Sequence, residues 1–208
     1  MTQPASTVFV VDDDASVRRS LARLLISGSY QVETFSSAVE FLASDRHHQS
    51  PACLVLDLSM PGLTGIDLQV RLREIQSPLA IVFITGHGDI PSSVQAMKGG
   101  AVDFLQKPFD DIQLLDAVAR ALERAEKDEK VFAKLTAIRE RYATLTTRER
   151  EVMAHIVTGK LNKQVADDLG TVEKTIKVHR ARVFEKMQVQ SLAELVPLAV
   201  KLGLLESN

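Results

Sequence analysis

The sequence has 208 residues, 45% of them apolar, and a formal net charge of −2 at pH 7, which suits an ordinary soluble protein of one large or two small domains. The single cysteine, Cys53, excludes an internal disulfide and favours the cytosol. No apolar run approaches the roughly 18–20 residues that span a bilayer. The first residues, MTQPAST, lack a signal-peptide pattern, so we expect a cytoplasmic protein without a membrane partner.

Charge is distributed unevenly along the chain. Residues 1–125 carry 10 Lys and Arg against 15 Asp and Glu, a net of −5. Residues 126–143 carry 5 against 4, a net of +1, and residues 144–208 carry 10 against 8, a net of +2. An acidic first part and a mildly basic last part predict two domains with different tasks, 1–125 and 144–208, joined by a linker at 126–143.

Apolar runs alternate with helical patterns through the first part. Strands are predicted at 7–11, 30–35, 53–58, 79–85 and 101–106, and helices at 15–27, 37–42, 65–75 and 90–98 and from 110 onward. Asp14 or Ser16 can cap the first helix and Gly28 can end it, while Ser37 and Glu40 have the spacing of a capping box. This alternation predicts a parallel, doubly wound sheet. The flavodoxin-like strand order 2-1-3-4-5 is taken from known sheets and not from the sequence itself.

Chemically capable residues stand where four of these strands end: Asp12 and Asp13, Asp57, Thr85, and Lys107. Asp57 alone could simply cap the loop that follows it. The carboxyl ends of parallel strands meet at one edge, however, and two carboxylates about 4 Å apart repel by roughly 4 kcal/mol at an effective dielectric of 20. Such a cluster favours Mg²⁺. With a lysine and a hydroxyl beside it, a carboxylate nucleophile can accept a phosphoryl group.

The motifs VVDDD, LVLDLSMPG, ITGHGD and FLQKPF occur in the order and spacing of the receiver domain of two-component response regulators, which roughly residues 5–125 resemble. The resemblance implies that Asp57 is the phosphoacceptor, supplied by a sensor histidine kinase, and that the protein is not an enzyme acting on an outside substrate. It implies a cis Lys107-Pro108 bond. Asp14 stands where the family often has Glu. The implied roles of the remaining residues are Mg²⁺ binding by Asp13, Asp57 and the Ser59 carbonyl, with Asp12 through water; contact of Thr85 and Lys107 with phosphoryl oxygens; and an inward swing of Phe104 on activation.

The helix that opens at 110 has two possible ends. Ile112, Leu115, Val118 and Leu122 form one apolar stripe, and Val131, Leu135, Ile138 and Tyr142 form a second after the charged segment EKDEK. One continuous helix over 110–143 or two helices with a charged break both fit the pattern. The second stripe could dock on a neighbouring domain or form a dimeric coil.

Four helices are predicted in the last part. Thr146 and Glu149 form a capping box, Asn162 can cap a short second helix, and Ser191 can cap the last. Between them, EKTIKVHRARVFEKM carries a net charge of +3 from Lys174, Lys177, Arg180, Arg182 and Lys186 against Glu173 and Glu185. A short helix, a tight turn and a basic helix are the helix-turn-helix pattern, although basic helices are more often plain solvated surface.

LTTRERE, NKQVADDL and EKTIKVHRARVFEKM together resemble the four-helix DNA-binding domain of NarL/FixJ (LuxR-type) regulators over about residues 142–205. The resemblance places the Lys177–Arg180 turn in the major groove of double-stranded promoter DNA, with Lys177 and Val178 facing base edges. Phosphate contacts would come from Lys163, Lys174, Thr175, Arg182 and Lys186. Val165, Ala166, Leu169, Ile176, Val183, Met187 and Leu195 are predicted core. Thr171-Val172 replaces the family's usual Ile-Ser, so either Thr171 caps the basic helix one residue early or the helix starts loosely.

These features predict a transcription factor that forms a homodimer when Asp57 is phosphorylated. We expect the dimer to bind promoter DNA and to act on RNA polymerase as an activator. Within the family the sequence resembles the FixJ subgroup, particularly regulators of styrene and other aromatic-hydrocarbon breakdown. Two alternatives remain open: a haloacid-dehalogenase-like phosphatase, whose D-x-D motif Asp12-x-Asp14 imitates, and a receiver with a protein- or RNA-binding output. The five histidines, 47, 48, 87, 155 and 179, show no metal spacing; His87 would lie at the rim of the phosphorylation pocket.

Overall fold

The computed structural model describes residues 6–86 and 90–205, so the predicted rim position of His87 lies outside the described residues. The chain divides into two compact units, Met1–Lys130 and Val131–Asn208. None of the described helices is long and apolar enough to cross a membrane.

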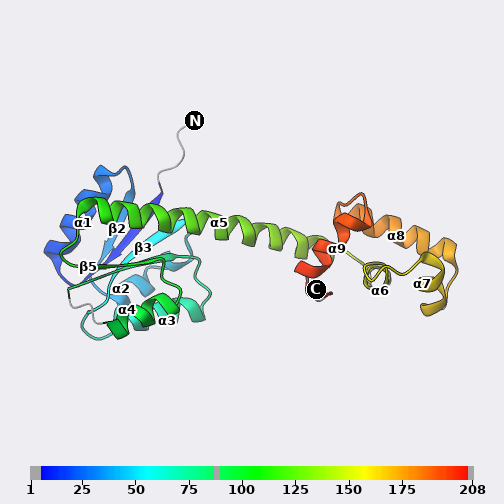
Figure 1. The fold of residues 1–208 in the computed structure, drawn as a ribbon, viewed down its shortest axis with the longest axis horizontal. Coiled ribbons are helices and arrows are strands. Elements are labelled where there is room, and N and C mark those ends of the chain that lie inside the picture. Colours follow the sequence, from blue (N-terminus) through cyan, green and yellow to red (C-terminus); the bar gives the residue numbers. More distant parts are fainter. Residues whose placement is uncertain (1–5, 87–89, 206–208) are drawn as a thin grey trace. The chain divides into compact units, whose positions relative to one another are not determined.

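A five-stranded parallel sheet forms the centre of the first unit (Figure 1). Its order is β2-β1-β3-β4-β5, which confirms the predicted order. Because β1 and β3 are neighbours, with Val11 opposite Leu56, Asp12 after β1 and Asp57 at the end of β3 meet at the same edge. The strands are β1 Thr7–Val11, β2 Gln31–Phe35, β3 Ala52–Asp57, β4 Ala80–Thr85 and β5 Asp103–Gln106.

Helices cover both faces of this sheet, which explains why β1, β3 and β4 are buried along their whole length. Side chains from α2 Ala38–Ala43, α3 Gly65–Glu74 and α4 Ile90–Lys98 pack on one face, together with Phe9, Leu54 and Phe83 of the sheet. Side chains from α1 Ala15–Ser27 and from the first part of α5 Asp111–Ala143 pack on the other face with Val10, Val55 and Ile84. Figure 1 shows α1 and α5 on one side and α3 and α4 on the other.

Local signals locate most helix ends in this unit. Asp14 caps α1 by accepting hydrogen bonds from the backbone N–H groups of Ser16 and Val17, and Ser37 caps α2 through the N–H of Glu40. Gly28 ends α1 as predicted, but with φ −80° and not the left-handed conformation usual for such a glycine. A Cβ atom at Gly28 would lie 2.9 Å from Leu115 Cδ2, so the glycine serves close packing against α5.

The long helix α5 is continuous from Asp111 to Ala143, so the alternative with a break at the charged segment is wrong. Ion pairs one turn apart run through that segment, since Glu123 contacts Lys127 at 2.7 Å and Arg124 contacts Asp128 at 2.8 Å. Such pairs stabilise an exposed helix by about 0.2–0.5 kcal/mol each, which lets it continue where no apolar face is buried. Further along, Ile138 and Tyr142 pack into the core of the second unit, as one interpretation of the second stripe predicted.

The second unit adds four helices: α6 Thr147–Ile156, α7 Asn162–Asp168, α8 Glu173–Met187 and α9 Leu192–Lys201. Capping by Thr146 and Ser191 is confirmed. The prediction that Asn162 caps α7 is wrong, because Leu161 holds that position and its N–H donates to Gln164 Oε1 at 2.8 Å. The predicted core is confirmed, with one member, Leu169, only half-buried; its other members are Val165, Ala166, Ile176, Val183, Met187 and Leu195.

The start of α8 settles the question raised by Thr171-Val172. Val172 is the N-cap residue and makes no side-chain capping hydrogen bond, so Thr171 does not cap the helix. Two backbone contacts close the first turn instead, from the N–H groups of Thr175 and Ile176 to the Val172 carbonyl. Burial of Ile176, Val183 and Met187 one or two turns apart therefore stabilises α8 more than its cap does.

Candidate functional site

Three carboxylates gather where β1 and β3 end. Asp12, Asp13 and Asp57 each place one oxygen within 4.8 Å of the others. Asp12 is 1% exposed and Asp57 is 5% exposed, whereas Asp13 faces solvent. Burial raises the pKa of Asp57, which the neighbouring charges of Asp12 and Asp13 raise further and Lys107 opposes. The cluster is therefore a poor place for uncompensated negative charge.

Lys107 reaches into this cluster from the end of β5. Its ammonium group donates hydrogen bonds to Asp12 Oδ2 at 2.7 Å and to Asp57 Oδ1 at 3.2 Å. Burial alone would lower the pKa of Lys107, but the hydrogen bond to Asp12 and the charges of both carboxylates raise it. Lys107 is therefore a fixed positive charge between two buried carboxylates, and one lysine cannot balance three of them.

Backbone geometry holds these side chains in place. The Leu58 N–H donates to the Ile84 carbonyl at 3.0 Å, and the Lys107 N–H donates to the Thr85 carbonyl at 2.7 Å. These contacts continue the strand pairing just past Asp57 and past β5. The Lys107-Pro108 peptide bond is cis, as the resemblance implies. The carboxyl ends of β3, β4 and β5 are thus tied together around the cluster.

The other predicted receiver residues surround the same edge. Thr85 ends β4 with its side chain fully buried, and Ser59 is exposed in the loop after β3. Phe104 on β5 is half-buried, with its ring centroid 6.5 Å from that of Phe83. The analysis of the sequence missed Arg18, whose guanidinium donates to the Asp12 carbonyl at 2.6 Å. Its position, one turn after the capping Asp14, was the available signal.

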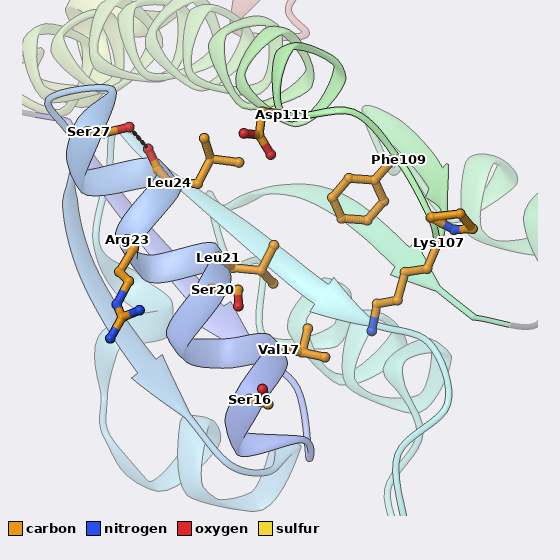
Figure 2. A pocket seen from close by; sticks show the side chains of 11 residues that line it. Ser16, Val17, Ser20, Leu21, Arg23, Leu24, Ser27, Lys107, Phe109 and Asp111 are labelled. Atoms are coloured by element: carbon orange, nitrogen blue, oxygen red, sulfur yellow. Dashed lines mark hydrogen bonds between the residues drawn. The ribbon is translucent and has the colours of Figure 1, made fainter.

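A cleft of about 650 Å³ opens between α1 and the segment from Lys107 to Asp111 (Figure 2). Val17, Leu21 and Phe109 line it with apolar groups, and the Lys107 side chain extends along one end (Figure 2). Its polar lining includes Ser16, Ser20, Arg23 and Asp111. A partner that occupied this cleft would lie directly beside the carboxylate cluster.

In the second unit, α8 presents a polar face opposite its buried one. Lys174, Lys177 and Arg182 are exposed, and so is Val178, at 47%. Lys163 is exposed on α7, while Thr175 is half-buried. Exposure of an apolar valine to water is unfavourable. A contact with the methyl group of a thymine in the major groove would bury such a side chain.

Several of the predicted phosphate or base contacts already have partners within the protein. Lys177 pairs with Glu173 at 3.0 Å on the exposed surface, and Arg180 donates to Asn162 Oδ1 at 3.2 Å. Lys186 donates to Glu149 Oε2 at 2.6 Å, and Glu149 is 2% exposed. The positive charge of Lys186 is thus neutralised by a buried carboxylate, which makes its side chain part of the fold of this unit.

Comparisons with known proteins agree for both units. Residues 8–119 match the response regulator receiver domain, and residues 143–199 match the bacterial regulatory proteins of the luxR family. Nodulation protein W of Bradyrhizobium diazoefficiens is 48% identical over 95% of this chain and 86% of its own length. The transcriptional regulatory protein FixJ of the same organism is 45% identical over 95% and 96%.

Solved structures of response regulators match this chain over nearly its full length. The response regulator StyR superimposes with a TM-score of 0.84 at 46% identity, covering 95% of this chain and all of its own. The protein is therefore a response regulator of a two-component system, with a histidine kinase as partner and DNA as target of its output domain. Its relatives place it among the FixJ-like transcriptional regulators of the NarL/FixJ family, not in a known class of enzymes.

Proposed function

We propose that Asp57 accepts a phosphoryl group from the histidine of a sensor kinase and that this modification controls DNA binding. The supporting observation is that buried Asp57 and Asp12 are bridged by the ammonium group of Lys107. An Asp57 carboxylate oxygen attacks phosphorus, the P–N bond of the phosphohistidine breaks, and the imidazole leaves. Lys107 and Thr85 lie at the same edge of the sheet and would contact the phosphoryl oxygens.

Mg²⁺ fits this cluster. Asp12, Asp13 and Asp57 with Lys107 carry a net charge of about −2, and carboxylates with water are the ligands that Mg²⁺ prefers. We propose Asp13, Asp57 and the Ser59 carbonyl as direct ligands, with Asp12 acting through water. When bound, Mg²⁺ would offset the charge of the carboxylates and of the incoming phosphoryl oxygens.

Incubation with acetyl phosphate and Mg²⁺, followed by mass spectrometry, tests both assignments. The expected result is one phosphoryl adduct per chain, lost in Asp57→Asn and retained in Asp116→Asn, which alters an exposed carboxylate of α5. The haloacid-dehalogenase alternative predicts instead rapid hydrolysis of the phosphodonor that depends on Asp12. An adduct that survives Asp57→Asn would contradict the assignment.

We further propose that the kinase docks on the cleft between α1 and the Lys107–Asp111 segment. Its apolar floor suits the apolar side chains of a helix, and it lies next to Lys107. Ser20→Glu and Arg23→Glu, at two exposed positions of the cleft, should reduce phosphotransfer from the kinase while leaving labelling by acetyl phosphate unchanged. Loss of both reactions would indicate damage to the acceptor site and not to a docking surface.

Phosphorylation adds a charge of about −1.5 to −2 at the sheet edge, and we propose that Thr85 and Phe104 respond by repositioning. Exposed apolar side chains on α4 and α5, Val94, Met97 and Ile112, support a homodimer that forms over the α4–β5–α5 face. Analytical ultracentrifugation with and without beryllofluoride and Mg²⁺ tests this step. We expect a shift to dimer that Asp57→Asn abolishes; an unchanged monomer would contradict it.

For the output we propose that α8 enters the major groove, with Lys177, Val178 and Arg180 towards base edges and Lys163, Lys174, Thr175, Arg182 and Lys186 towards phosphates. The exposed Lys174, Val178 and Arg182 support this assignment more strongly than Lys186, which Glu149 already pairs. An RNA-binding output is tested by competition of bound DNA with RNA, and a protein-binding output predicts no DNA binding at all. We also propose that the protein contacts RNA polymerase and regulates genes of aromatic-hydrocarbon breakdown. Transcription assays on candidate promoters test both proposals.

We also propose the domain limits 1–125, 126–143 and 144–208, and that the last turns of the 126–143 linker are needed for the third part to fold. The side chains of Ile138 and Tyr142 pack with the second unit, which supports treating the last turns of α5 as necessary for that unit to fold. Limited proteolysis tests this point, because a stable C-terminal fragment should begin before Ile138. A stable fragment that starts at residue 144 would contradict it.

A further inference from the structure

A loop at the opposite edge of the receiver sheet from Asp57 brings three metal-binding side chains together. Asp45, His47 and His48 lie between α2 and the start of β3, whereas Asp57 ends β3. One ligand atom of each residue lies within 4.8 Å of the others. We propose that they form a binding site for a divalent transition-metal ion of the zinc, nickel and copper class.

The distances are close to those of a metal site. His47 Nε2 and His48 Nε2 each lie 3.8 Å from the same oxygen, Asp45 Oδ1. Metal–nitrogen and metal–oxygen bonds of about 2.0–2.1 Å in a tetrahedron separate ligand atoms by about 3.4 Å. Each histidine nitrogen is thus within a few tenths of an ångström of the required separation from Asp45 Oδ1, and the exposed side chains of Asp45 and His48 can move to complete the site.

Backbone conformation explains why no spacing pattern in the sequence indicates this arrangement. The three ligands stand at positions 45, 47 and 48, a spacing that neither a regular helix nor a strand would bring to one face. Asp45 adopts a left-handed conformation with φ 59°, and a single 3₁₀ turn, η1 Arg46–His48, follows it. The turn brings the two imidazole rings to a centroid distance of 4.3 Å.

The loop is held by hydrogen bonds that leave the three ligands available. The Ser77 hydroxyl donates to the His47 carbonyl at 2.6 Å, and the Gln49 side chain donates to Thr7 Oγ1 at 2.9 Å. Arg46, which stands between the ligands in sequence, pairs with Glu33 at 3.0 Å. A loop anchored in this way loses little conformational entropy when an ion binds.

The ligand chemistry selects the class of ion. Two imidazole nitrogens and one carboxylate favour zinc, nickel or copper over Mg²⁺, which prefers oxygen ligands. Asp45 and His48 are 85% and 61% exposed in their side chains, so an ion can enter from solvent. Three protein ligands leave a further coordination position for water or a partner's side chain. Cys53 is fully buried and offers no competing thiolate.

Calorimetric titration of the full-length, tag-free and metal-stripped chain with Zn²⁺ tests the proposal, with saturating Mg²⁺ present to occupy the Asp57 cluster. We expect one saturable site per chain. Because loss even of a supporting partner costs about 10–100-fold in metal affinity, His48→Ala and Asp45→Asn should each weaken binding by about tenfold or more. Both positions are exposed, and circular dichroism checks that the variants fold.

Two further variants serve as controls. His155→Ala removes a histidine of the second unit, and Asp57→Asn removes the proposed phosphoacceptor; both should bind Zn²⁺ like the unmodified chain. This inference is therefore independent of the proposed function. Unchanged affinity in His48→Ala and Asp45→Asn, or the absence of a saturable site under these conditions, would overturn it.

Discussion

Gly65 lies directly against Asp57, because a Cβ atom at Gly65 would overlap the carbonyl oxygen of Asp57. The Gly65 N–H also donates to the Leu58 carbonyl at 3.1 Å, so the start of α3 is fixed to the loop that leaves β3. The missing side chain at Gly65 thereby lets α3 begin close to the end of β3.

Gly65→Ala should destabilise the receiver unit by about 2 kcal/mol, because the added methyl group forces backbone to move at Asp57 and Leu58. Helix propensity alone predicts the opposite, a gain of up to about 1 kcal/mol. Thermal unfolding followed by circular dichroism distinguishes the two. Gly86→Ala, where a Cβ atom would meet nothing within 4 Å, is the matched control and should change little.

Asp57→Asn should stabilise the receiver in the absence of Mg²⁺. Burial raises the pKa of Asp57, so the folded state holds its proton more tightly than the unfolded state. The ionised carboxylate therefore costs stability above that pKa, and the cost disappears as pH falls below the unfolded value. The melting temperature of Asp57→Asn should exceed that of the unmodified chain at neutral pH, and the difference should shrink towards acid pH. A constant difference across pH would contradict this origin.

Lys107→Met should have the opposite effect and destabilise the receiver by about 3 kcal/mol, because Asp12 and Asp57 lose their shared cation while remaining buried. Adding Asp57→Asn to Lys107→Met should recover part of the loss. Denaturation in Mg²⁺-free buffer measures both variants. If Asp57→Asn changed the free energy of unfolding equally with lysine and with methionine at position 107, the two side chains would not interact.

Lys186→Met should loosen the second unit by about 2 kcal/mol, since Glu149 is 2% exposed and would lose the hydrogen bond that chiefly lowers its pKa. A lowered folded pKa means that this stabilisation is present above the ordinary value of 4.5 and is lost as pH falls through the folded pKa. Hydrogen exchange of the amides in α6 and α8 provides the measurement. Lys174→Met, an exposed lysine of α8, should leave exchange unchanged.

The two kinds of proposed DNA contact should differ in salt dependence. Lys174→Ala should reduce the slope of log affinity against log salt by about 1, because one phosphate contact is lost. Val178→Ala should leave the slope unchanged and relax base preference by about 1 kcal/mol at one position. Fluorescence anisotropy on a fragment selected from a random-sequence pool measures both. Identical slopes for the two variants would contradict the assignment.

Local patterns were sufficient for most of the receiver. Buried parallel strands are short apolar runs, and the carboxyl ends of such strands meet at one edge, so Asp12, Asp57, Thr85 and Lys107 could be assigned to one place before any coordinates. The capping residues Asp14, Ser37, Thr146 and Ser191 were predictable for the same reason, because each acts within one turn of its own position.

Contacts between distant residues were decided only by the tertiary structure. The partner of Lys186 is 37 residues away at Glu149, and the close approach that requires Gly28 comes from Leu115 on another helix. Neither leaves a periodic signal in sequence. The continuity of α5 also depended on tertiary context, because Ile138 and Tyr142 are held by the second unit's core. The sequence by itself therefore determined the strands, most of the helix caps and the sheet edge where Asp12, Asp57 and Lys107 meet, since these follow from local chemistry. Tertiary packing determined that Lys186 pairs with a buried carboxylate, that Gly28 allows close helix packing, and that His47 and His48 lie near Asp45.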